Sequence, residues 1–113
     1  MLPQLHVRQL PEFIGARPAG ERVLLLDVRE PWEVAHAPLH VAGTDALHIP
    51  LGQLPGRLDE VPDSQPVVCI CHHGVRSLQA VAFLVRHGHP DVYNLAGGTD
   101  AWSMEVDPRV PRY

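Results

Sequence analysis

The stretch Val67–Arg86 reads VVCICHHGVRSLQAVAFLVR and carries the clearest structural pattern in the chain. Its first four residues form a short apolar run, which is typical of a strand covered on both faces of a parallel sheet. From Ser77 to His87, apolar residues recur at the i, i+3, i+4, i+7 spacing of an amphipathic helix, and Gly88 follows as a C′ residue. A strand that leads through a short loop into a helix is the building unit of α/β domains.

The same two patterns alternate on either side of this stretch. A second apolar run indicates a secure strand at 23–28, and weaker strand signals lie at 5–7, 47–49 and 92–95. Helical patterns lie at 10–14, at 32–36 with Pro31 as first helical residue, and from a Thr99 cap through Trp102 and Met104. The helical spacing at 51–58 is interrupted by Pro55 and Gly56. This alternation predicts a doubly wound α/β sheet with right-handed crossovers and helices on both faces.

Length and composition fit one ordinary domain. The chain has 113 residues, of which 45% are apolar, so a single core is expected over residues 1–113. The segment 107–113 contains Pro108 and Pro111 and is expected to be an extended, at most partly ordered tail.

The charge pattern excludes some classes of partner. Thirteen acidic residues stand against nine basic ones, all arginine, and the net charge of −4 is spread along the chain. This balance favours neither nucleic acid nor an anionic membrane as partner.

The first residues lack the pattern of a secretory signal, and no stretch approaches the roughly 18 apolar residues of a membrane span. We therefore expect a cytoplasmic protein.

Cys71 is the candidate nucleophile. It lies where the 67–70 strand ends, and in open α/β sheets ligands bind beyond the carboxyl ends of strands, where helix N-termini present free amides. Gly74 allows the loop to curl so that backbone N–H groups converge on one centre. Together with the helix dipole and Arg76, they favour the thiolate, since helix-terminal cysteines reach pKa values of roughly 3.5–7.5 against about 8.5 for an ordinary thiol. The Ser77 hydroxyl could donate to the same sulfur or cap the helix.

Three segments resemble the rhodanese family, in the family's order and over nearly the whole chain. Residues 71–77 resemble its active-site loop, residues 26–33 its Asp-Val-Arg-Glu segment, and residues 95–102 its Gly-Gly-x-x-Ala-Trp signature. The resemblance implies a five-stranded parallel sheet and a sulfurtransferase reaction without metal or organic cofactor. Cys71 would take a sulfane sulfur as a persulfide and pass it to a thiophilic acceptor.

The resemblance also implies the substrates and the residues that bind them. The donor would be a small anionic sulfur compound such as thiosulfate, and the acceptor a small thiophile or a protein thiol. Arg76 would attract the anionic donor, and the amides of His72 to Arg76 would cradle the transferred sulfur. The predicted substrate-binding residues are His72, His73, Gly74, Val75, Arg76 and Ser77.

Two other functions remain open at this stage. The first is a persulfide carrier or docking module for a biosynthetic partner, which would use Cys71 in the same way. The second is a Cdc25-type phosphatase or arsenate reductase. Such phosphatases have a similar fold but five residues between cysteine and arginine, whereas four separate Cys71 from Arg76.

Several nearby residues have simpler interpretations. Cys69 lies inside the apolar strand, so packing is favoured over a role as resolving thiol. Exposed loop histidines are as good an interpretation of His72 and His73 as a catalytic one, and the Cys-x-Cys-His-His cluster lacks the spacing of a zinc site. For Asp27 and Arg29 a structural role, in which an ion pair or hydrogen bonds order the active-site face, is favoured over direct contact with substrate. Trp32 and Trp102 are interpreted as core or edge-packing residues.

Overall fold

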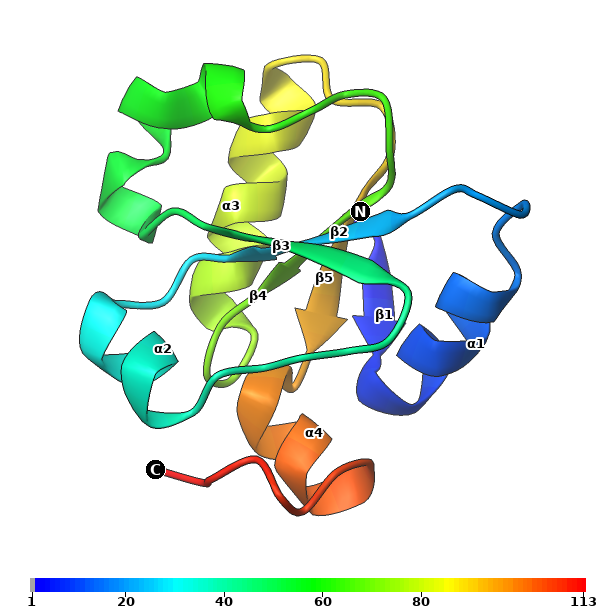
Figure 1. The fold of residues 1–113 in the computed structure, drawn as a ribbon. Coiled ribbons are helices and arrows are strands. Elements are labelled where there is room, and N and C mark those ends of the chain that lie inside the picture. Colours follow the sequence, from blue (N-terminus) through cyan, green and yellow to red (C-terminus); the bar gives the residue numbers. More distant parts are fainter. Residues whose placement is uncertain (1) are drawn as a thin grey trace.

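Five parallel strands form one sheet in this computed structural model, which describes residues 2–113. The strand order is β1-β5-β4-β2-β3 (Figure 1). The strands are β1 (Gln4–His6), β2 (Val23–Asp27), β3 (Thr44–His48), β4 (Val67–Ile70) and β5 (Val92–Ala96). All four neighbouring pairs run parallel, which confirms the predicted fold class. β3 begins three residues earlier than its sequence signal, because residues 44–46 pair with β2 although Asp45 and Ala46 are exposed.

Residues 2–113 contain four α-helices; the first three each follow one strand and lead to the next, and the last follows β5. They are α1 (Leu10–Gly15), α2 (Pro31–His36), α3 (Val75–Arg86) and α4 (Gly98–Glu105). Where the sequence has an interrupted helical spacing at 51–58, the structure has two 3₁₀ helices, Leu51–Gln53 and Pro55–Glu60. Pro31 is the first residue of α2, as expected. 

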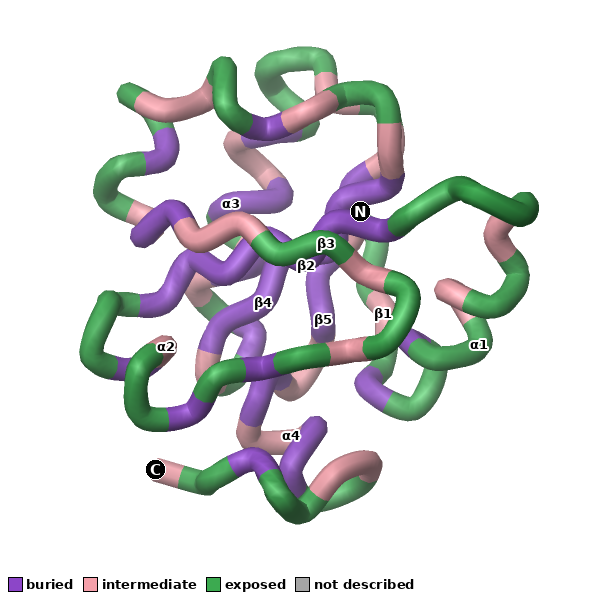
Figure 2. Tube along the Cα trace, viewed as in Figure 1, coloured by how far each residue is buried: buried purple, intermediate pink, exposed green. Residues whose placement is uncertain are grey.

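The sheet separates two apolar cores, and its central strands are buried on both sides (Figures 1 and 2). Side chains of β4 alternate between them: Val67 and Cys69 belong to the core under α3, and Val68 and Ile70 to the core under α1 and α4. Cys71 continues the first series at the end of the strand. The continuous apolar run in the sequence is thus explained by burial on both faces.

Two helix starts differ from the sequence expectation. α3 begins at Val75 rather than Ser77, because Gly74 takes a left-handed conformation (φ 97°) and is the N-cap. The prediction of Thr99 as a cap is wrong: Gly97 (φ 85°) is the N-cap of α4, and Thr99 lies in the first turn. Ser77 does not cap a helix either, since it is the third residue of α3.

The segment after α4 runs across the molecule toward α2. Val110 is buried, and its carbonyl oxygen accepts a hydrogen bond from Ser103 Oγ at 2.6 Å. Arg112 pairs with Asp100 at 3.0 Å. The tail expected to be extended over 107–113 instead begins with a turn, in which the N–H of Val110 donates to the carbonyl oxygen of Asp107 at 3.2 Å, and these contacts hold it against the domain.

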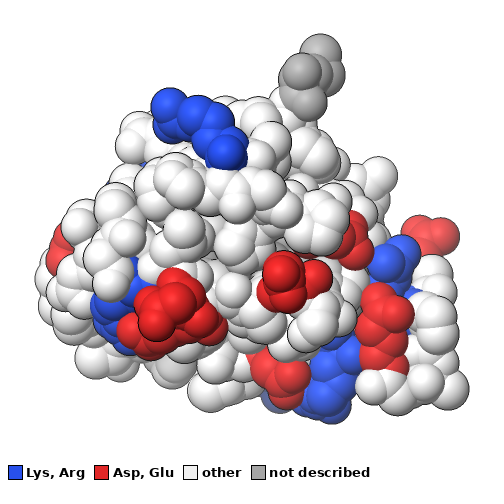
Figure 3. Space-filling view, turned by 90° about the horizontal axis from the view of Figure 1, so that it is seen from above, with Lys and Arg blue, Asp and Glu red and all other residues white. Residues whose placement is uncertain are grey.

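The surface charges form small mixed groups. On the face shown in Figure 3, acidic and basic side chains lie in adjoining clusters rather than in one field of a single sign. Among residues 2–113, none of the helices has the length and apolar character needed to cross a bilayer.

Candidate active site

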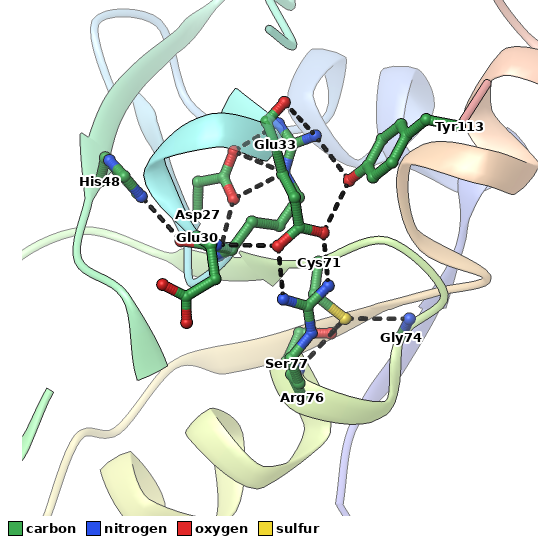
Figure 4. A network of polar contacts seen from close by, with 10 residues as sticks. Asp27, Glu30, Glu33, His48, Cys71, Gly74, Arg76, Ser77 and Tyr113 are labelled. Atoms are coloured by element: carbon green, nitrogen blue, oxygen red, sulfur yellow. Dashed lines mark hydrogen bonds and ion pairs between the residues drawn. The ribbon is translucent and has the colours of Figure 1, made fainter. Parts of the chain in front are cut away.

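Cys71 lies directly after β4 and its sulfur faces the start of α3 (Figure 4). Sγ accepts hydrogen bonds from the backbone N–H of Gly74 at 3.1 Å and of Ser77 at 3.3 Å. These are the amides of the N-cap and third residue of α3, so the sulfur takes the place that a capping side chain usually fills. The positive end of the helix dipole is thus directed at Sγ. The Cys71 side chain is buried, with 1% of its surface exposed.

The first turn of α4 fixes the other side of the loop. The N–H groups of Thr99 and Asp100 donate to the carbonyl oxygens of Cys71 (2.9 Å) and His72 (3.0 Å). In a trans peptide the C=O and the following N–H point in opposite directions, so the amides of His72 and His73 point away from α4. Of the loop residues 72–77, all of which the structure describes, only Gly74 and Ser77 donate to the sulfur.

Arg76 is held by a carboxylate that sequence reasoning did not single out. Its guanidinium makes two hydrogen bonds of 2.7 Å to the oxygens of Glu33, whose side chain is only 5% exposed. The hydrogen bonds from Arg76, helped by the backbone N–H of Glu30, lower the pKa of Glu33 to about 2 despite its burial. The pKa of Arg76 is raised above its ordinary value by the same pairing. The predicted role of Arg76 in attracting an anionic donor therefore has to compete with Glu33.

This pair predicts a pH-dependent stability difference between the wild type and Glu33→Gln. Because the folded-state pKa of Glu33 lies below its unfolded value, its stabilisation is complete above about pH 5 and is lost as the pH falls from about 4.5 toward 2. We expect Glu33→Gln to lose on the order of 2–3 kcal/mol at pH 7 and progressively less in that window, measured by urea unfolding. The exposed Glu60, paired with Arg57, offers Glu60→Gln as a control with little effect. A difference that stays constant from pH 7 to pH 3 would contradict the assignment.

Arg29 forms a buried ion pair with Asp27, as the sequence indicated. The guanidinium is fully buried and donates to Asp27 through Nε (2.9 Å) and Nη2 (2.7 Å), and to the carbonyl oxygen of Ala37 at 3.0 Å. Burial opposes the charged form, but the hydrogen bonds with Asp27 and Tyr113 keep the pKa of Arg29 above its ordinary value. The pair lies behind the active-site loop and touches neither Cys71 nor Arg76.

Tyr113 joins these two ion pairs. Its hydroxyl accepts from Arg29 Nη1 at 3.1 Å and donates to Glu33 Oε1 at 3.0 Å (Figure 4). Its ring stacks on His72, with centroids 3.9 Å apart and planes 8° from parallel. A continuous chain of hydrogen bonds therefore runs from Asp27 to Arg76, and its middle member comes from the tail.

The hydrogen-bond partners of the Cys71 sulfur include neither histidine of the loop. His72 packs beneath Tyr113, and burial lowers its pKa. His73 is exposed, with Nδ1 3.9 Å from Asp100. Val75 is 66% exposed at the rim of the loop. Within residues 2–113, no group of three or more His, Cys, Asp and Glu side chains is placed to hold a metal ion.

The remaining interpreted residues divide between core and surface. Cys69 is buried, and burial, together with the neighbouring Cys71, raises the pKa of its thiol. Its sulfur is thus poorly suited to nucleophilic attack, in agreement with a packing role. Trp102 is a core residue, whereas Trp32 is 64% exposed and its ring meets the ring of Tyr113 edge-on.

Three residues of the site were missed in the sequence: Glu33, Tyr113 and Asn94, whose side chain accepts from Ser77 Oγ and donates to the carbonyl oxygen of Gly74. Asn94 did give a signal, because a polar residue inside an apolar strand must find partners when it is buried. Glu33 lies within the segment of family resemblance but was not given a role. Tyr113 gave none, since a tail carries no periodicity that would predict its contacts.

Fold and site together define a class: all-parallel α/β domains in which a cysteine at a strand end is held by the N-terminus of the next helix. Comparison with known proteins names the family within that class. Residues 11–105 match the family described as Rhodanese-like domain, and the chain belongs to this family. 

Its relatives include named sulfurtransferases. A sulfurtransferase of Allochromatium vinosum is 42% identical over 90 residues, which cover 80% of each chain. The thiosulfate sulfurtransferase GlpE of Pseudoalteromonas translucida is 32% identical over 92 residues, covering 81% of this chain and 84% of the relative. Among solved structures, a rhodanese-related protein from Thermoplasma volcanium superimposes with a TM-score of 0.75 at 29% identity, covering 92% of this chain and 93% of the other. Rhodanese-type sulfur transfer is thus the activity for which these relatives are named.

Proposed function

We propose that this protein is a sulfurtransferase that carries sulfur as a persulfide on Cys71. One observation carries the proposal most directly: two backbone N–H groups at the start of α3 converge on Sγ. A negatively charged sulfur gains from both hydrogen bonds and from the helix dipole. Membership of the rhodanese-like family and the names of the relatives support the same chemistry.

The reaction has two steps. The Cys71 thiolate attacks the outer sulfur of a thiosulfate-type donor, so that a new S–S bond forms, the donor's S–S bond breaks and sulfite leaves with the electron pair. A thiophilic acceptor, such as a small thiolate or a protein thiol, then attacks the terminal sulfur and releases the Cys71 thiolate. In the loaded state, the amides of the loop 72–76 stabilise the terminal sulfur anion. Neither step requires a metal or an organic cofactor.

The substrate class follows from the loop. Four residues separate Cys71 from Arg76, and a loop of this size suits one sulfur atom better than a tetrahedral phosphoryl group. Glu33 already occupies the Arg76 guanidinium, so a donor anion gains less from Arg76 than from a free arginine. A protein persulfide, which depends less on attraction by Arg76, is therefore proposed as a second sulfur donor besides thiosulfate.

We propose that the reaction takes place in a reducing compartment such as the cytoplasm, in keeping with two free cysteines.

Mass spectrometry tests the proposal. After incubation with thiosulfate and removal of excess donor, the intact protein should gain the mass of one sulfur atom, located on the peptide that contains Cys71. Cys71→Ser should abolish this gain. Cys69→Ala is the matched control, because it removes the neighbouring thiol on the same face of β4, and it should load as the wild type does. Loading on Cys69, or failure to load with thiosulfate and with a protein persulfide alike, would contradict the proposal.

A further inference from the structure

A chain of buried polar side chains lies behind Cys71. Ser77 Oγ is 3.2 Å from Cys71 Sγ and 2.5 Å from Asn94 Oδ1. Ser77 comes from α3 and Asn94 from β5, and both side chains are buried. Asn94 Nδ2 in turn donates to Gln4 Oε1 at 2.8 Å and to the carbonyl oxygen of Gly74 at 3.1 Å. The chain therefore links the sulfur to two strands and to the loop itself.

The directions of these hydrogen bonds follow from their chemistry. The carbonyl oxygen of Gly74 can only accept, so the group of Asn94 that faces it must be the NH₂. Oδ1 is then the atom that faces Ser77, and it has no hydrogen of its own. Because a hydroxyl carries a single hydrogen, the short contact with Asn94 uses the only one that Ser77 has.

Ser77 consequently presents lone pairs to the sulfur. A neutral Cys71 thiol can donate its S–H to Ser77 Oγ, but a thiolate would meet a second acceptor at 3.2 Å. The Ser77 side chain thus favours the thiol, while the backbone N–H groups of Gly74 and Ser77 favour the thiolate. Four charged or titratable groups lie near Cys71. They are Arg76 and its partner Glu33, His72, and Cys69, which precedes Cys71 by two residues and belongs to the same core.

We propose that Asn94 is a positioning residue that keeps the hydroxyl hydrogen of Ser77 away from the Cys71 sulfur. When Cys71 ionises, its proton leaves to solvent, and the Ser77 hydroxyl turns from Asn94 Oδ1 to donate to Sγ. This rotation of the hydroxyl breaks the hydrogen bond from Ser77 to Asn94. The free energy of that hydrogen bond therefore influences how readily the Cys71 thiolate forms. This inference deepens the proposed function, on which it rests for the importance of the thiolate.

Alkylation of Cys71 by iodoacetamide, followed by peptide mass spectrometry as a function of pH, tests the inference. In Asn94→Leu, Ser77 is free to donate to the sulfur, so alkylation at pH 7 should be about three- to tenfold faster, the factor that one ordinary hydrogen bond is worth. At high pH, where every Cys71 is ionised, the rates should converge. In a Ser77→Ala background the same substitution should leave the rate unchanged, since no hydroxyl remains to be released. 

Two further variants distinguish an effect on the orientation of the Ser77 hydroxyl from general damage to the loop. Gln4→Ala removes one partner of Asn94 but leaves the Gly74 carbonyl to fix the amide, so its alkylation should match the wild type. Asn94→Asp keeps an acceptor oxygen for Ser77 and should alkylate more slowly than the wild type, which gives a second comparison if Asn94→Leu does not fold. Faster alkylation of Asn94→Asp, an unchanged rate in folded Asn94→Leu, or an increase that persists without Ser77 would overturn the inference. No sulfur donor is used, so failure to form a persulfide is a separate result.

Discussion

Asp27→Ala is expected to bring the domain close to unfolding at room temperature. The substitution leaves the fully buried Arg29 guanidinium without the carboxylate that accepts from its Nε and Nη2. Breaking a buried ion pair from one side typically costs about 3–5 kcal/mol, because the remaining charge stays desolvated. Domains of this size are only about 5–15 kcal/mol stable in total. Urea unfolding followed by circular dichroism measures the loss.

The surface pair Arg22–Asp45 provides the matched control. It has the same chemistry and a similar distance of 2.7 Å, but both side chains are about half exposed. Exposed pairs contribute little because water screens them, so Asp45→Ala should hardly move the unfolding midpoint. Asp27→Asn, which keeps an acceptor but removes the charge, should fall between the two. Equal effects of Asp27→Ala and Asp45→Ala would show that Arg29 is not a buried, uncompensated charge in the variant.

The elements that the sequence predicts well are those with local causes. The apolar runs of β2 and β4 and the 3.6-residue period of α3 are properties of neighbouring residues, and both strands and the body of α3 lie where expected. The starts of α3 and α4 were misplaced because glycines in left-handed conformation, not side chains, end the preceding loops. The orphan amides of α4 are satisfied by carbonyl oxygens from the distant active-site loop, and no local pattern encodes such a tertiary cap.

The same distinction applies to the site. Cys71, Gly74 and Arg76 lie within six consecutive residues, so their spacing alone indicated a site. Their partners come from far away in the chain: Glu33 is 43 residues from Arg76, and Tyr113 is 84 from Arg29. Contacts at such separations depend on the folded topology, in which α2, the loop and the tail meet at one end of the sheet. A sequence can indicate that a buried polar residue needs a partner, but not which one it finds.

Gly98→Ala is expected to abolish sulfur loading even though residue 98 carries no functional group. A Cβ there would lie 2.4 Å from the carbonyl oxygen of Cys71 and 2.5 Å from that of His72. Both contacts are with backbone, so neither can be relieved by turning a side chain. The two carbonyls accept hydrogen bonds from α4. Pushing them away rotates the peptide groups whose N–H groups are proposed to stabilise the transferred sulfur. We expect loading by thiosulfate to fall about a hundredfold or more, as misplacement of reacting groups by about 1 Å commonly does.

Gly20→Ala separates this steric effect from backbone strain. Gly98 and Gly20 both have a left-handed φ (62° and 85°), but nothing lies within 4 Å of the position that a Cβ of residue 20 would take. Alanine should therefore cost only the strain of that conformation, about 1–2 kcal/mol, and leave the loading rate as in the wild type. If Gly98→Ala loads as fast as Gly20→Ala while both remain folded, the close packing of α4 on the loop does not orient the amides. The reactive geometry would then have to be an intrinsic property of residues 71–77.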